Sequence, residues 1–110
     1  MEIKDTLNIK AEFGDTPGAR YKKDGDHSGQ EFLEDYLRPK FIKAKESGYI
    51  LSVVLDGLWG SPSSFISGSF GLLSIEFGKD MVLKHLQLVS ANKITYQKYI
   101  SEINNPTADQ

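Results

Sequence analysis

The sequence contains no cysteine, and this absence removes several kinds of chemistry at once. Disulfide bonds, thiolate nucleophiles and thiolate metal sites all need that side chain. Long apolar runs are also missing, because no stretch of the sequence approaches the roughly 20 apolar residues that span a bilayer. The first residues, MEIKD, lack the apolar segment of a secretory signal. We therefore expect a cytoplasmic protein with no membrane association.

The sequence also lacks a strong excess of either charge. The net charge is −2 over 110 residues, which gives little attraction to phosphate backbones, so nucleic acid is not an expected partner. The two histidines, His27 and His85, lie far apart with no cluster of ligand-type residues, so we expect no metal and no cofactor. The length and the ordinary hydrophobic content predict a single domain over residues 1–110, with a flexible polar tail at 104–110.

Hydrophobic periodicity predicts strands and helices in alternation. Strands are expected within residues 3–13, 49–57 and 83–90, the first at an edge and the second, a β-branched apolar run, at the centre of the sheet. Helices are expected over residues 29–47 and 62–77, and a third after Asn92 as its cap. This order predicts an α/β fold with a small mixed sheet around a parallel core, packed by about three helices.

Boundary signals support the first predicted helix. Ser28 and Glu31 have the spacing of a capping box, and Gly48 is a typical helix end. Pro39 lies inside the pattern, where its ring and missing N–H predict a kink or a restart.

The segment LDGLWGSPSSF, residues 55–65, is the most informative part of the chain. Ser61 is expected to cap the second helix and Pro62 to be its first residue, which places Ser63 and Ser64 in the first turn beside free backbone amides. Ligands of open α/β sheets usually bind at this end of a strand. The pattern suits a phosphorylatable serine or a bound phosphate, and equally an ordinary helix start.

Three neighbouring residues are further candidates for binding. Trp59 and Phe65 could form an apolar contact patch for a partner, or both could belong to the core. Asp56 could bind a cation, orient a serine hydroxyl or simply form a turn with Gly57.

The segment at 13–29 is rich in glycine and aspartate, which predicts a long loop, with a short strand at residues 19–21. Arg20, Lys22 and Lys23 could contact an anion if this loop folds over the start of the second helix, or they could be solvated charges balanced by nearby aspartates.

The passage SVVLDGLWGSPSSFISGSFGLL, residues 52–73, resembles STAS domains, in which a central strand runs into a Ser-Ser turn and a glycine-rich helix. Taken with GDTPGARY, SGQEF and LVSAN elsewhere, nearly the whole chain resembles the STAS-like domain family of unknown function. The resemblance implies a STAS-like sheet and the role of a protein-interaction module. In the anti-sigma-factor antagonist branch, a serine of this turn is phosphorylated by a partner kinase with the histidine-kinase-like ATPase fold, and Ser63 matches that serine by position. Pro62 and Phe65 stand where that turn has Asp and Gly.

These observations together favour a non-catalytic regulatory module over an enzyme, since no set of nucleophile, base and orienting group is evident. One alternative is a phosphate- or nucleotide-binding accessory protein, although neither a GxxxxGK[ST] nor a GxGxxG pattern is present. The other is a hydrolase or transferase in which His27 activates Ser63 or Ser64 beside an oxyanion hole at the helix start.

Overall fold

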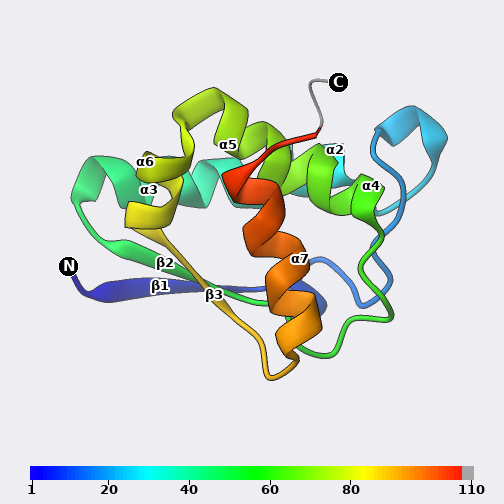
Figure 1. Cartoon of the computed structure of the whole chain (residues 1–110), viewed down its shortest axis with the longest axis horizontal. Helices are drawn as coiled ribbons and strands as arrows, with labels where there is room; N and C mark the ends of the chain where they lie inside the picture. The colour runs from blue at the N-terminus through cyan, green and yellow to red at the C-terminus, as the bar shows by residue number, and fades with distance from the viewer. Residues whose placement is uncertain (108–110) are drawn as a thin grey trace.

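The computed structural model describes residues 1–107 and contains a three-stranded sheet with strand order β1-β2-β3 (Figure 1). The strands are β1 (Ile3–Asn8), β2 (Ile50–Val54) and β3 (Leu86–Val89), and both pairings are parallel. The α/β class and the central place of the 49–57 strand are confirmed. The sheet is not mixed as expected, because both strand pairs among the described residues are parallel. Among residues 1–107, no helix has the length and apolar character needed to cross a membrane.

The helices cover one face of this sheet and leave the other uncovered (Figure 1). Parallel connections share one hand, so a sheet built in the order 1-2-3 carries both of its crossovers on the same side. Burial follows this arrangement: Leu86 and Leu88 of β3 are buried, whereas the alternate residues Gln87 and Val89 are exposed. The strands follow one another in the sheet in the same order as in the sequence. The sheet therefore has no point at which the connections of two neighbouring strands lie on opposite faces.

The first strand ends earlier than its alternating pattern predicts. Asn8 caps a short helix, α1 (Ile9–Glu12), by accepting a hydrogen bond from the Ala11 N–H at 3.1 Å. The Glu12 carboxylate in turn accepts from the Asn8 N–H at 2.9 Å. This reciprocal capping competes successfully with strand pairing, so the prediction of a strand to residue 13 is wrong beyond Asn8.

The first long helical segment runs through α2 (Gly29–Phe32), the π-helical η2 (Leu33–Leu37) and α3 (Arg38–Ser47). The Ser28 hydroxyl accepts a hydrogen bond from the Glu31 N–H at 3.0 Å, and Gly48 ends the helix with a φ of 74°, as predicted. The irregularity expected at Pro39 is the wide π-turn immediately before it, which accommodates the missing N–H and the bulk of the ring.

The second helical segment comprises α4 (Ser63–Ile66), the π-helical η3 (Ser67–Gly71) and α5 (Leu72–Phe77). Apolar residues at helical spacing are buried along it, with Ile66, Phe70 and Leu73 each no more than 2% exposed. After Gly78 comes a helix that the sequence analysis missed, α6 (Lys79–His85). It occupies the first residues of the predicted 83–90 strand, because Val82 and His85 both turn into the core at helical spacing.

The last helix, α7 (Lys93–Asn104), packs across the front of the helical layer in Figure 1. Asn92 caps it, as predicted, by accepting from the Thr95 N–H at 3.0 Å. The tail predicted to be flexible lies only partly within the described residues, since residues 108–110 lie outside them. The N–H and the hydroxyl of Thr107 both donate to the Glu102 carboxylate.

Candidate functional site

A pocket of about 420 Å³ lies where β2 and β3 end and α7 begins. Its polar lining comes from three segments: Asp56 and Ser61 after β2, Ser90 and Asn92 after β3, and Thr95 and Lys98 on α7. The loop after β2 that forms one wall, residues 56–62, is called the Trp59 loop below. The carboxyl ends of parallel strands meet at one edge of a sheet, so this location matches the edge at which ligands of α/β proteins usually bind.

Asp56 joins the two loops that enclose the pocket. Its Oδ1 accepts a hydrogen bond from the Ala91 N–H at 2.8 Å, and the adjacent Leu55 N–H donates to the Val89 carbonyl at 2.8 Å. Gly57 follows with a φ of +85°, a conformation that glycine adopts without steric cost. The carboxylate therefore does more than form the predicted Asp-Gly turn, since it also fixes the position of the segment leading into α7.

Ser61 does not cap the second helix, contrary to the prediction. Pro62 occupies the cap position, while the Ser61 side chain is turned inward and is only 7% exposed. Its hydroxyl accepts from the Tyr99 hydroxyl at 3.0 Å, and its carbonyl accepts from Lys98 Nζ at 2.9 Å. Burial raises the pKa of Tyr99 to about 12, so this phenol remains protonated at neutral pH. The contacts with α7 thus decide the orientation of Ser61.

Ser63 and Ser64 are the first residues of α4, where the sequence predicted them. Ser63 is exposed and Ser64 is partly exposed. No side-chain capping bond is made at the start of this helix. The Ser63 hydroxyl is therefore accessible from solvent at the end of the Trp59 loop.

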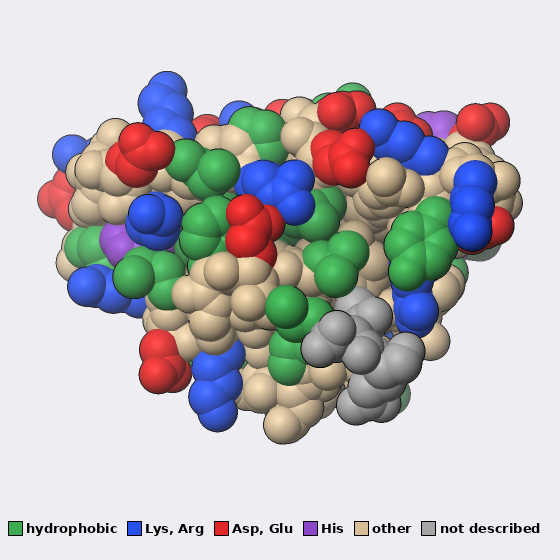
Figure 2. Space-filling view, turned by 90° about the horizontal axis from the view of Figure 1, so that it is seen from above, with side chains coloured by type: hydrophobic (Ala, Val, Ile, Leu, Met, Phe, Trp, Pro, Cys, Tyr) green, Lys and Arg blue, Asp and Glu red, His purple; other side chains and the backbone are tan. Residues whose placement is uncertain are grey.

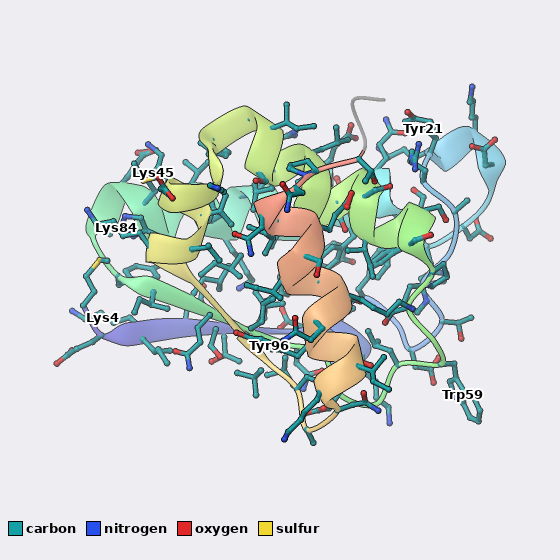
Figure 3. The ribbon with its side chains drawn as sticks, in the orientation of Figure 1. Lys4, Tyr21, Lys45, Trp59, Lys84 and Tyr96 are labelled. Carbon is teal, nitrogen blue, oxygen red and sulfur yellow. The ribbon has the colours of Figure 1, made fainter. Side chains whose placement is uncertain are left out.

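The predicted contact patch of Trp59 and Phe65 is divided between surface and core. Trp59 is 77% exposed and extends away from the ribbon in Figure 3, whereas Phe65 is fully buried. Phe65 packs against Phe32, with 5.6 Å between the ring centroids. The Trp59 N–H donates to the Asp15 carbonyl at 2.6 Å, which ties the Trp59 loop to the 13–29 loop.

The 13–29 loop does fold against the second helical segment, but Arg20 does not line the pocket. Its backbone and Cγ pack so closely on Gly68 that a Cβ at that glycine would lie 2.9 Å from each of the Arg20 Cγ and carbonyl oxygen. Arg20 Nε is buried with no hydrogen-bond partner among the described residues. Residues 19–21 form no strand, because the Ala19 and Arg20 carbonyls accept from the first amides of α2 instead.

Two lysines of this loop make contacts away from the pocket. Lys22 and Glu34 form an ion pair at 2.7 Å, and their hydrogen bond raises the pKa of Lys22 and lowers that of Glu34. The Lys23 ammonium lies over the Tyr21 ring, 5.6 Å from its centroid. On the helical side of the molecule, acidic and basic side chains are interspersed (Figure 2), and no broad surface of one charge is visible there.

The contact of His27 with Ser63 or Ser64, which the hydrolase or transferase alternative requires, is not formed among residues 1–107. His27 packs edge-on against Phe13, with 5.3 Å between the ring centroids, and it makes no hydrogen bond to Ser63 or Ser64. Nor do residues 1–107 contain a group of three His, Asp or Glu side chains placed to hold a metal ion.

Lys98 and Thr95 are pocket residues that the sequence analysis missed. Both follow a correctly predicted cap, yet a lysine and a threonine on the outside of a helix have no local signal that separates them from other surface residues. Only the packing of α7 against the Trp59 loop brings them to the pocket.

No protein-family model, no curated protein and no solved structure matches this chain.

Proposed function

We propose that this protein is a non-catalytic regulatory module that binds another protein through the Trp59 loop and the start of α4. The observation that carries the proposal is the 77% exposure of the Trp59 side chain. Tryptophan is among the residues that contribute most to binding at protein interfaces, because it buries a large rigid surface at a small entropic cost. An exposed tryptophan on a loop tied down by its own backbone is therefore suited to docking in a pocket of a partner.

The loop is tied to the 13–29 loop without any partner bound. The Asp15 carbonyl accepts from the Trp59 N–H, and Gly57 and Gly60 have φ values of +85° and +74° that suit glycine. A loop that is already ordered loses less conformational entropy on binding.

Ser63 supplies the regulatory part of the proposal. Its exposed hydroxyl lies four residues from Trp59, within the same surface segment. Transfer of a phosphoryl group would form a bond from Ser63 Oγ to the γ-phosphorus of ATP and break the bond to the bridging oxygen, with release of ADP. The hydroxyl proton would pass to a base of the kinase. The modification adds about −1.5 to −2 charges, enough to repel or reorient a partner at this surface.

The partner class follows from the resemblance of residues 52–73 to STAS domains, which names a histidine-kinase-like ATPase as the candidate kinase. Two steps test the proposal. First, the tagged wild-type protein, Trp59→Ala and Tyr96→Ala are used for capture from the cytosol of cells that express the protein. Tyr96 is a matched control, because it is another exposed aromatic residue, 36% exposed, on α7.

We expect the Tyr96→Ala variant to capture the same partner as the wild type and the Trp59→Ala variant to lose it. Equal capture by all three proteins contradicts the proposed surface. Second, the purified partner is incubated with ATP and the wild type, Ser63→Ala or Ser64→Ala, and phosphoserine is mapped. Phosphate at Ser63 supports the switch, whereas unchanged affinity of Ser63→Asp for the partner contradicts it.

A further inference from the structure

The pocket beside the Trp59 loop holds two opposite charges that do not pair with each other. Lys98 Nζ donates to the Ser61 carbonyl, and Asp56 Oδ1 accepts from the Ala91 N–H. Neither side chain takes part in any ion pair formed within residues 1–107. Each charge is thus positioned by one neutral backbone group and keeps hydrogen-bonding capacity for a molecule inside the pocket.

A buried hydroxyl of the same pocket also has an unused donor. The Ser61 side chain is 7% exposed and accepts from the Tyr99 hydroxyl at 3.0 Å. Because the tyrosine supplies the proton of that bond, the hydrogen of Ser61 itself remains free to be donated. No acceptor for it exists among the described residues, and Ser61 lines the pocket. A buried donor without an acceptor is costly unless a water molecule or a ligand accepts from it.

Part of the pocket lining is apolar and is called the apolar wall below. It is formed by Leu55 and Leu58 of the strand end and the Trp59 loop, and by Ile94 in the first turn of α7. Ile94 is 75% exposed, so its side chain remains available to an apolar group at the entrance.

From these three features we infer that the pocket binds a small zwitterion with an aliphatic side chain, that is, a free α-amino acid of the leucine type. The ligand carboxylate would contact Lys98 and the Ser61 hydroxyl, its ammonium group would contact Asp56, and its side chain would lie on the apolar wall. Inorganic phosphate and nucleotide phosphates fit the same site less well, because a multiply charged anion would lie near the Asp56 carboxylate. This site goes beyond the protein-binding surface proposed above and does not depend on it.

Calorimetric titration of the full chain tests the inference with L-leucine as the probe. Leucinamide has the ammonium group and the side chain of leucine but lacks the carboxylate. The compound 4-methylpentanoate has the carboxylate and the side chain but lacks the ammonium group. Inorganic phosphate is an anion with no ammonium group and no side chain. We expect leucine to bind at least about tenfold more tightly than any of the other three, since each lacks a charge-assisted contact.

Two variants separate the two ends of the ligand. Lys98→Met keeps the apolar stem and should weaken leucine binding by about tenfold to a hundredfold, with no change for leucinamide. Asp56→Asn can still accept from the Ala91 N–H and should weaken leucine similarly, with no change for 4-methylpentanoate. Lys93→Met is the control, because Lys93 is an exposed α7 residue outside the pocket.

Three results would overturn the inference. The first is the absence of saturable leucine binding up to a leucine concentration of about 10 mM. The second is binding of phosphate or 4-methylpentanoate that is as tight as the binding of leucine. The third is an equal loss of leucine affinity in Lys98→Met and Lys93→Met. Thermal melts of every variant, run alongside, establish that each protein titrated is folded.

Discussion

The hydroxyl of Tyr99 donates a hydrogen bond to the hydroxyl of Ser61 at 3.0 Å, and this contact joins the last helix to the segment that leads into α4. Both side chains are buried, with Tyr99 fully inaccessible. The contact therefore has two consequences that can be measured, one for stability and one for its dependence on pH.

The Tyr99→Phe substitution should lower the free energy of unfolding by about 1 kcal/mol, because it removes a buried hydrogen bond without leaving a cavity. The Ser61→Ala substitution should cost a similar amount or more, since the buried phenol then has no acceptor. Urea unfolding of the wild type, both single variants and the double variant gives the coupling energy. A coupling energy of zero would show that the two hydroxyls do not interact, and Tyr96→Phe, at an exposed tyrosine, should be neutral.

Stability should also fall as pH rises in the alkaline range. Burial raises the pKa of Tyr99 from 10.0 to about 12, so the unfolded chain loses this proton at a lower pH than the folded protein. The contribution of Tyr99 is fully present below pH 10 and is lost as pH rises through about 12. Its expected slope in that interval is at most about 1.4 kcal/mol per pH unit. Urea unfolding at several pH values should show a steeper decline for the wild type than for Tyr99→Phe, and identical slopes would refute the shift.

Two glycines of the π-helical segment η3 should respond differently to alanine. A Cβ at Gly68 would lie 2.9 Å from the Arg20 carbonyl oxygen, which cannot move without displacing the 13–29 loop. The Gly68→Ala variant should therefore lose about 1–3 kcal/mol of stability. At Gly71 the nearest atom is Glu102 Oε1 at 3.0 Å, the end of a flexible side chain.

The Gly71→Ala variant is the matched control for this comparison. It should be neutral or stabilised by up to about 1 kcal/mol, because alanine is the better helix former. Thermal and urea unfolding of both variants measure the difference, and a neutral Gly68→Ala variant would mean that the loop does not pack tightly on Gly68.

Trp59 and Phe65, which the sequence predicted as a shared contact patch, should differ sharply in their effect on stability. The Trp59→Ala variant should change the free energy of unfolding by no more than about 0.5 kcal/mol, because the ring is largely in solvent. The Phe65→Ala variant should cost about 3–5 kcal/mol, because it empties a fully buried site beside Phe32. Substantial destabilisation by Trp59→Ala would mean that the ring is packed rather than displayed.

Local signals in the sequence predicted much of the fold. The caps Ser28 and Asn92, the glycine end at Gly48 and the apolar strand around Val53 depend on neighbours within a few residues, and all were found where expected. The α6 helix was missed because its apolar residues run directly into the alternating pattern of β3.

The candidate site was harder to predict because its geometry depends on distant contacts. Ser61 has the local sequence of a helix cap, yet Tyr99 and Lys98, nearly forty positions away, turn it into the interior. The pairing of Asp56 with Ala91 and the packing of Arg20 on Gly68 are likewise tertiary and leave no local pattern. The exposure of Ser63 at the start of α4 agrees with the local pattern, in which a polar residue opens the helix before the apolar Phe65 and Ile66.

The uncovered face of the sheet has a consequence for how this sequence can change over time. Side chains such as Thr6 and Gln87 are exposed and do not line the pocket, so replacing them with other strand-forming residues should not disturb it. Variation is thus expected to accumulate on that side, while the opposite side is constrained by the core and by whatever the protein binds.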